Sequence, residues 1–159
     1  MNLPMWERLR RYRALDAESR ALFWRAFRLL PQVTLSLRLR GYAKTETSLH
    51  SRAKRRPDSI VAEQDVALRI AKTSRMVRAA SHLGSIRATC LAQSLTLWLL
   101  LQQQNISSAI KIGVRKKDGR MEAHAWVERN GVTLNETDEV HQHYAPFERE
   151  FANTPAEPL

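Results

Sequence analysis

The sequence predicts an α+β protein in which one apolar helix packs against an antiparallel sheet. The helix that begins near Cys90 carries apolar residues on nearly every side, as in "CLAQSLTLWLLL", so we expect it at the centre of the fold. The segment Ser108 to Lys116 alternates apolar and polar residues, which is typical of a strand. The stretch from Glu122 to Glu136 then reads as a hairpin around Asn130-Gly131. A helix followed by antiparallel strands favours the α+β class.

The segments that precede this helix are predicted to be largely helical. Asp16 is a candidate N-cap for a helix over residues 17–30, with an apolar face and an arginine-bearing face. Pro31 is expected to break or kink this helix, and the residues after it fit either a strand or a helix. A further helix is expected from Ile60 to about Leu83. Thr89 or Ser85 is available to cap the apolar helix.

The positive charge of the chain is concentrated in its first third. Residues 1–57 contain 14 Lys and Arg against 4 acidic residues, whereas residues 58–159 contain 12 of each. The polar, basic stretch "SLHSRAKRRPDS" lies where the two regions meet. We therefore predict a basic helical extension at 1–57 and a separate core domain at 58–159. The extension is either a structural cap with solvated arginines or a surface for an anionic partner.

Composition excludes several classes of protein. A single cysteine in 159 residues permits no internal disulfide, which fits a reducing compartment. The N-terminus lacks the apolar core of a signal peptide, and the run "LTLWLLL" is far shorter than the ~20 residues that span a bilayer. We expect a soluble, cytoplasmic protein without a transmembrane segment. Nucleic acid is not an expected partner, because the sequence shows no zinc-finger spacing, RNA-binding aromatic motif or clear helix-turn-helix.

The position of Cys90 admits two interpretations. A lone cysteine is most often a small buried hydrophobe. At the N-terminus of a helix, however, the helix dipole and unpaired N–H groups favour the thiolate, which is the nucleophilic form. The same N–H groups can stabilise an oxyanion, and a neighbouring imidazole would complete the activation. Cys90 is therefore the candidate nucleophile.

Five histidines could supply that imidazole. His124 differs from the others because it lies on a predicted strand between two alanines, which leave room beside it. His141 and His143 could hold zinc together with Cys90, although their spacing matches no standard zinc motif. His124 is therefore the candidate base, and no metal is expected.

The length of the loop at Asn130-Gly131 determines which acid lies beside His124. A two-residue turn at Asn130-Gly131 would place position 136 opposite position 125, so that Glu136 lies on the other face of the sheet from His124. A three-residue loop that includes Arg129 would place Glu136 directly opposite His124. We predict the three-residue loop, which makes Glu136 the candidate orienting acid. The order Cys, His, acid also fits a papain-like arrangement, in which a helix bearing the nucleophile packs against a sheet bearing the other two groups.

Three stretches resemble the transglutaminase-like peptidases that mature lasso peptides. They are "CLAQSLTLWLLLQQQNI", "IKIGVRKKDGRMEAHAWVERNGVTLNE" and "VHQHYAPFE", and the resemblance extends over roughly residues 58–148. It implies a papain/transglutaminase-like core, here with an N-terminal helical extension. It also implies a catalytic triad in which Cys90 is the nucleophile and His124 the base. The family usually has Asp at the third position, where this chain has Glu136; Asn135 and Asp138 are the alternatives.

The resemblance implies a cysteine peptidase that removes the leader peptide from a ribosomally made precursor by hydrolysis, without a cofactor. The first 57 residues show no winged-helix pattern, so the chain looks like the split form, in which leader recognition belongs to a separate small protein. The product would pass to an ATP-dependent macrolactam synthetase. Gln93 is a candidate for the second oxyanion donor. The alternative functions are a transglutaminase-like acyltransferase and a non-catalytic basic interaction module.

Overall fold

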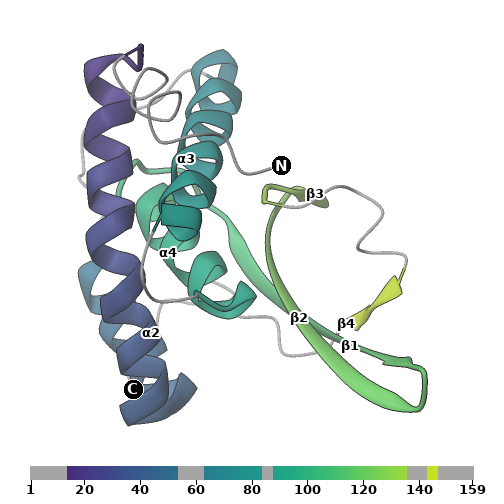
Figure 1. Ribbon diagram of the computed structural model, residues 1–159. Helices are drawn as coiled ribbons and strands as arrows, with labels where there is room; N and C mark the ends of the chain where they lie inside the picture. The colour runs from purple at the N-terminus through teal and green to yellow at the C-terminus, as the bar shows by residue number, and fades with distance from the viewer. Residues whose placement is uncertain (1–13, 54–62, 84–87, 136–142, 147–159) are drawn as a thin grey trace, which may run out of the picture.

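The fold combines a group of helices with a small antiparallel sheet, which confirms the predicted α+β class. The computed structural model describes residues 14–53, 63–83, 88–135 and 143–146. The helices and strands within these ranges are, in chain order, α2 (Ala17–Arg52), α3 (Glu63–Leu83), α4 (Cys90–Gln102), β1 (Ala109–Lys117), β2 (Arg120–Arg129), β3 (Val132–Thr133) and β4 (Ala145–Pro146). The helices gather on one side of the molecule and the hairpin of β1 and β2 extends on the other (Figure 1).

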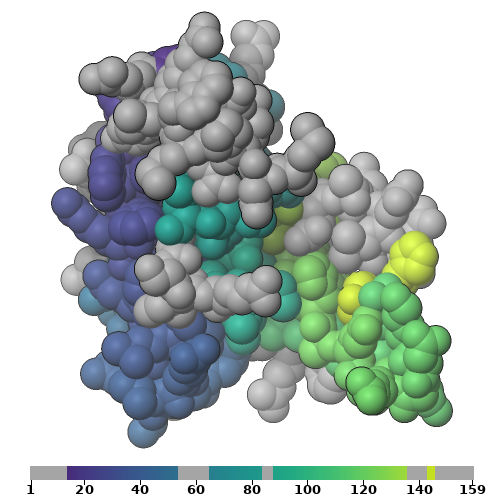
Figure 2. Space-filling view, viewed as in Figure 1, coloured from purple at the N-terminus to yellow at the C-terminus, as the bar shows by residue number. Residues whose placement is uncertain are grey.

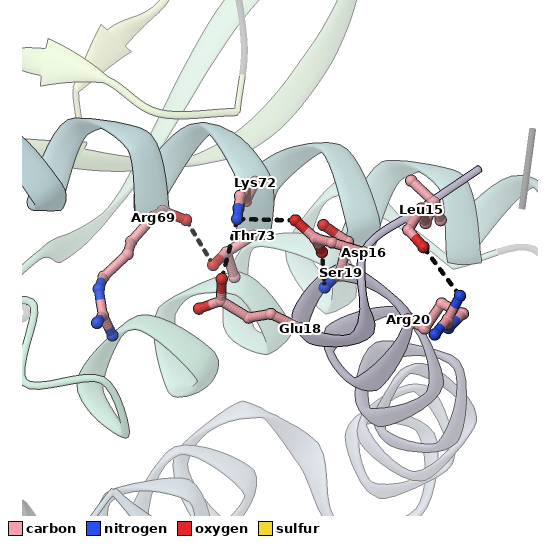
Figure 3. Close-up of polar contacts among 8 residues, drawn as sticks. All are labelled: Leu15, Asp16, Glu18, Ser19, Arg20, Arg69, Lys72 and Thr73. Atoms are coloured by element: carbon pink, nitrogen blue, oxygen red, sulfur yellow. Dashed lines mark hydrogen bonds and ion pairs between the residues drawn. The ribbon is translucent and has the colours of Figure 1, made fainter. Parts of the chain in front are cut away.

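Helix α2 begins where the sequence predicts and is tied there to α3. The side chain of Asp16 caps the helix by accepting the backbone N–H of Ser19 at 2.6 Å. Lys72 of α3 reaches the same end, where its ammonium lies 3.0 Å from Asp16 Oδ2 and 2.9 Å from Glu18 Oε2 (Figure 3). The predicted cap is therefore confirmed, and its carboxylate also joins two helices.

The predicted break at Pro31 is wrong, because α2 continues through this residue. Pro31 removes one helical hydrogen bond, but Leu30 and Val33 beside it are buried in the core and hold the helical path. The path changes instead at Gly41, whose φ of 75° and ψ of 179° suit glycine alone. Beyond it the chain folds back, so that the hydroxyl groups of Ser36 and Thr45 meet at 2.8 Å. Helix α2 is thus a helical hairpin.

Helix α4 lies at the centre of the fold, as its apolar sequence predicts. Its leucines at 95, 97, 99, 100 and 101 are at most 1% exposed. Helices α2 and α3 pack on one side of it and β2 contacts it on the other (Figure 1). The same core includes side chains from α2, namely Leu22, Phe23, Ala26, Leu30, Val33 and Leu49. The apolar face of α2 therefore belongs to the core; residues 54–62, which include the predicted boundary at 57, lie outside the described ranges.

The sheet has the strand order β3-β2-β1-β4, and each pairing is antiparallel. Strands β2 and β3 pair Arg129 with Val132 and Glu128 with Thr133, so their loop has two residues. The predicted three-residue loop is therefore wrong. Asn130 and Gly131 both take positive φ values, 50° and 77°, which indicates a type I′ turn whose twist matches that of the strands. Among the described residues, no helix is both long and apolar enough to cross a bilayer.

Candidate active site

Cys90 is the first residue of α4, and its position follows from a capping interaction. Thr89 is the N-cap, with an extended backbone (φ −68°, ψ 162°), and its hydroxyl accepts the N–H of Ala92 at 3.2 Å. This confirms Thr89 as the cap and fixes the helix start one residue later. The thiol of Cys90 is half-buried at that start. It therefore lies where the helix presents its first N–H groups.

The side of α4 that carries Cys90 covers the edge of β2 that β3 leaves uncovered. In an antiparallel ladder, alternate residues direct their backbone groups to opposite neighbours. The hydroxyl of Ser94, one turn after Cys90, donates to the carbonyl of Ala125 at 2.9 Å. The N–H of Ala125 donates to the sulfur of Cys90. Both backbone groups of Ala125 are thus bonded by α4, which fixes the thiol against β2.

Asn135 completes this junction between α4 and the sheet. Its Oδ1 accepts the N–H of Val127 at 2.8 Å, and its Nδ2 donates to the hydroxyl of Ser94 at 3.2 Å. The N–H of Leu134 donates to the carbonyl of Val127 at 2.8 Å, which extends the contact of this segment with β2 beyond β3. The amide of Asn135 therefore replaces a strand carbonyl, which is a structural role.

The structure brings the predicted nucleophile and the predicted base together. The side chain of His124 forms a hydrogen bond with the thiol of Cys90, and this bond is the largest cause of a lowered pKa at Cys90. Burial acts in the opposite direction, and the N–H groups of Ala125 and Leu91 lower the pKa further. The net result favours the thiolate, so the pair has the chemistry of an activated nucleophile.

Two aromatic rings, those of Trp126 and Tyr144, lie near the imidazole of His124. The ring of Trp126, two residues along the same face of β2, is nearly parallel to it, with centroids 6.2 Å apart. The ring of Tyr144 is tilted by 35° with its centroid at 5.3 Å. Gly113 of β1 lies directly opposite His124. A Cβ at position 113 would lie 2.9 Å from Tyr144 Cβ and 3.0 Å from Trp126 Cη2, so only glycine fits there without displacing a ring.

Sequence reasoning did not identify Gly113, Trp126 or Tyr144 as part of the site. Gly113 carries a signal that was available, because a glycine inside the strand "IKIGVRK" indicates close approach by another group. Tyr144 carries no comparable signal, since it reaches His124 only through the pairing of β4 with β1. Its neighbour Ala145 pairs with Val114 in that ladder.

The remaining predicted site residues fall into two groups. Glu136 and Asp138 lie outside the described residues, so the orienting acid stays a prediction. If the observed two-residue register continued, position 136 would lie opposite 125 and not opposite His124. Gln93 is described, and its side-chain amide donates to the carbonyl of Ala88 at 3.0 Å. This bond uses part of the donor capacity that an oxyanion would need.

Other histidines of the chain lie in other surroundings. His50 on α2 contacts the ring of Trp98, with centroids 4.6 Å apart, and lies 3.9 Å from a carboxylate oxygen of Glu46. His143 is exposed, and His141 is outside the described ranges. Within those ranges, no three His, Cys, Asp or Glu side chains lie close enough to hold a metal ion.

We predict that the pairing with His124 governs the reactivity of Cys90. Because Cys90 is the sole cysteine, the rate of alkylation by iodoacetamide as a function of pH reports on it alone. The midpoint should lie below the ordinary cysteine range of about 8 to 9. His124→Ala should move it upward, because the main cause of the lowered pKa is lost. His143→Ala, which removes an exposed histidine, is the matched control and should leave it in place. Equal midpoints in wild type and His124→Ala would contradict the observed pairing.

Comparison with known proteins identifies the fold family. The chain matches the transglutaminase-like superfamily over residues 29–149, which is most of its length and includes both Cys90 and His124. The match begins within α2, upstream of the predicted core domain. No curated protein and no solved structure matches the chain. The chain belongs to the transglutaminase-like superfamily.

Proposed function

We propose that the chain is a cysteine peptidase that removes the leader peptide from a lasso-peptide precursor in the cytoplasm. The observation that carries the peptidase chemistry is the hydrogen bond between His124 and the thiol of Cys90 at the start of α4. Membership of the transglutaminase-like superfamily supports acyl chemistry at a cysteine. The choice of substrate rests on the sequence motifs that resemble lasso-peptide peptidases.

In the proposed reaction, His124 takes the proton of the Cys90 thiol and the sulfur attacks the carbonyl at the junction of leader and core. Backbone N–H groups at the start of α4 stabilise the oxyanion of the tetrahedral intermediate. His124 then gives its proton to the departing amine of the core, and the C–N bond breaks. Water attacks the resulting thioester, the C–S bond breaks and the leader leaves as a free acid. The reaction needs no oxidant, reductant or ATP.

We propose Glu136 as the orienting acid of the triad on the sequence resemblance alone, since the three-residue loop that would have placed it opposite His124 is not the one formed. A carboxylate bonded to the imidazole would hold its tautomer and stabilise the imidazolium that forms during attack. Asn135 is less suited to this role, because both ends of its amide already bond Val127 and Ser94. Asp138 remains the alternative.

The first functional prediction concerns the nucleophile. Cys90→Ala should lower cleavage of the full precursor by a factor of ~10⁴ or more, because a triad acts as a unit around its nucleophile. Mass spectrometry of the products should show the leader as a free acid. The circular dichroism spectrum and unfolding midpoint of the variant check that the fold is retained. Cleavage at the wild-type rate would overturn the peptidase proposal. A leader joined to an amine would show a transglutaminase-like acyltransferase.

The second functional prediction concerns Glu136. Glu136→Gln should reduce kcat for precursor cleavage, because a neutral amide stabilises the imidazolium less than a carboxylate does. Glu136→Asp should retain more activity, since it keeps the charge. Asp138→Asn is the matched control, as it removes the charge of the neighbouring candidate. If Asp138→Asn lowers kcat and Glu136→Gln does not, the orienting role belongs to Asp138.

We further propose that α2 docks a separate leader-recognition protein. The two arms of α2 enclose a groove of about 250 Å³. Its lining includes Leu35 and Leu39, which are 55% and 74% exposed, and the arginines Arg40 and Arg52. The later part of α2 lies on the surface, on the opposite side of the molecule from the hairpin of β1 and β2 (Figure 2). An apolar groove flanked by arginines fits an amphipathic helix with acidic flanks.

Charge supports an acidic partner for this groove. Helix α2 contains seven Lys and Arg but only two acids, Glu18 and Glu46. Glu18 pairs with Lys72 of α3, and Glu46 lies near His50 of the same helix. Among the described residues, neither Arg40 nor Arg52 has a carboxylate partner. The partner would hold the leader and raise the effective concentration of the cleavage site at Cys90, and the freed core would pass to an ATP-dependent macrolactam synthetase.

We predict that cleavage by this chain alone is slow, and that the leader-recognition protein accelerates it less as salt rises, because screening shortens to ~8 Å at physiological ionic strength. Leu39→Glu should weaken the acceleration by placing a carboxylate in the groove. Leu68→Glu is the matched control, since Leu68 is 58% exposed on α3, outside the groove. The measurement is the precursor cleavage rate with and without the partner at two salt concentrations. Equal acceleration in Leu39→Glu and wild type would place the docking site elsewhere.

A further inference from the structure

We propose that Tyr144, anchored by Arg115 of β1, is a positioning residue that holds the imidazole of His124 against the thiol of Cys90. Where it concerns catalysis, this inference rests on the proposed function. Where it concerns the reactivity of the thiol, it depends only on the described contacts. Tyr144 touches the base and not the reacting sulfur, so it acts through His124.

The first observation is the contact between the two rings. The centroids of Tyr144 and His124 are 5.3 Å apart, and Trp126 provides a second ring 6.2 Å away. The terminal torsion of a histidine side chain is broad, so an imidazole with space around it samples many orientations. Aromatic neighbours reduce that freedom through packing and favourable ring geometry. Tyr144 therefore limits the rotation that would move the imidazole away from Cys90.

The second observation is that the sheet is shaped to admit this ring. Strand β4 pairs Ala145 with Val114 and Pro146 with Gly113, which brings the preceding residue, Tyr144, next to β1. Position 113 has no side chain, and an added Cβ would lie 2.9 Å from Tyr144 Cβ and 3.1 Å from the carbonyl oxygen of Ala145. Cβ atoms in proteins essentially never lie within 3.0 Å of a non-bonded heavy atom. Gly113 is therefore what allows Tyr144 to reach His124.

The third observation is the anchor of the ring. The guanidinium of Arg115 lies over the ring of Tyr144, 4.6 Å from its centroid, in a cation–π contact. The same guanidinium is held by Glu122, its cross-strand neighbour, with Nη2 at 2.6 Å and Nε at 2.7 Å from Oε2. Two donors on one carboxylate oxygen fix the plane of the guanidinium. The hairpin of β1 and β2 thus holds the ring of Tyr144 through Arg115 as well as contacting it through His124.

The contacts form a continuous series from Glu122 through Arg115, Tyr144 and His124 to Cys90. Cys90 of α4 and Tyr144 before β4 contact His124 directly. The charged groups on the same face of the sheet are Arg115 and Glu122, which form an ion pair, and Lys111 and Glu128 by the register of β1 and β2. Replacing Tyr144 leaves all of these charged groups in the chain. The effect of Tyr144 on the thiol should therefore be one of geometry, through the bond that His124 makes.

The test compares Tyr144→Ala with Tyr144→Phe in the full chain. The pH dependence of iodoacetamide alkylation reports on Cys90 alone and needs no precursor. Tyr144→Ala should move the midpoint upward, toward that of His124→Ala, and lower the rate at pH 7 by about 2- to 10-fold, the range that an aromatic pair contributes. Tyr144→Phe keeps the ring and should retain most of the wild-type alkylation profile. A ring that served only to stabilise the fold would change the unfolding midpoint and leave the alkylation profile where it was.

A second variant keeps the proposal testable if Tyr144→Ala does not fold. Arg115→Met retains an apolar stem but removes the cation over the ring, and should produce a smaller shift in the same direction. Wild-type alkylation profiles in the folded Tyr144 and Arg115 variants would overturn the proposal. If the variants shift the alkylation profile but the wild-type chain does not cleave the precursor, the positioning role is supported and the proposed function is rejected. If the wild-type chain cleaves the precursor but the variants leave the alkylation profile unshifted, the proposed function is supported and the positioning role is rejected.

Discussion

The junction between the start of α4 and the edge of β2 is the interaction on which the rest of the site depends. Strand β3 ends after two residues, so β2 would expose backbone groups beyond it. Ser94, Asn135 and the sulfur of Cys90 bond those groups instead. Because the apolar remainder of α4 is the centre of the core, displacing this junction would disturb both the core and the sheet. The nucleophile is therefore positioned by interactions that the fold needs anyway.

The elements with strong local signals could be predicted from the sequence. The apolar helix, its Thr89 cap and the Cys90 start follow from the pattern of residues, as does the hairpin after it. The predicted break at Pro31 fails because burial of the residues beside it outweighs a local preference. The predicted three-residue loop between β2 and β3 is wrong, because it was chosen to bring Glu136 beside His124 and not from the turn residues themselves. The dipeptide Asn130-Gly131 is the signature of the two-residue type I′ turn, and this local signal is the one the structure obeys.

The site was predictable where its members carry distinctive chemistry. A sole cysteine at a helix start and a histidine on the following hairpin pointed to Cys90 and His124, and the structure places their side chains in contact. Their surroundings were not predictable in the same way. Tyr144 approaches His124 through a pairing between strands that are about 30 residues apart in the chain, and the structure places it beside a glycine whose role is to be small. Such contacts depend on the arrangement of the whole sheet, which no local pattern encodes.

The alternation of β2 has a consequence for how the site tolerates change. His124 and Ala125 are consecutive residues, and one supplies an imidazole to the sulfur while the other supplies a backbone N–H to the same atom. A single peptide unit joins the Cα of His124 to the N–H of Ala125, so the backbone places both groups at the sulfur together, and only the side-chain torsions of His124 remain to be set by its neighbours. A slip of β2 by one residue would put Ala123 or Ala125 in the place of His124 and present a methyl group where the imidazole belongs. In this protein the choice of strand register is also the choice of whether the thiol has a base.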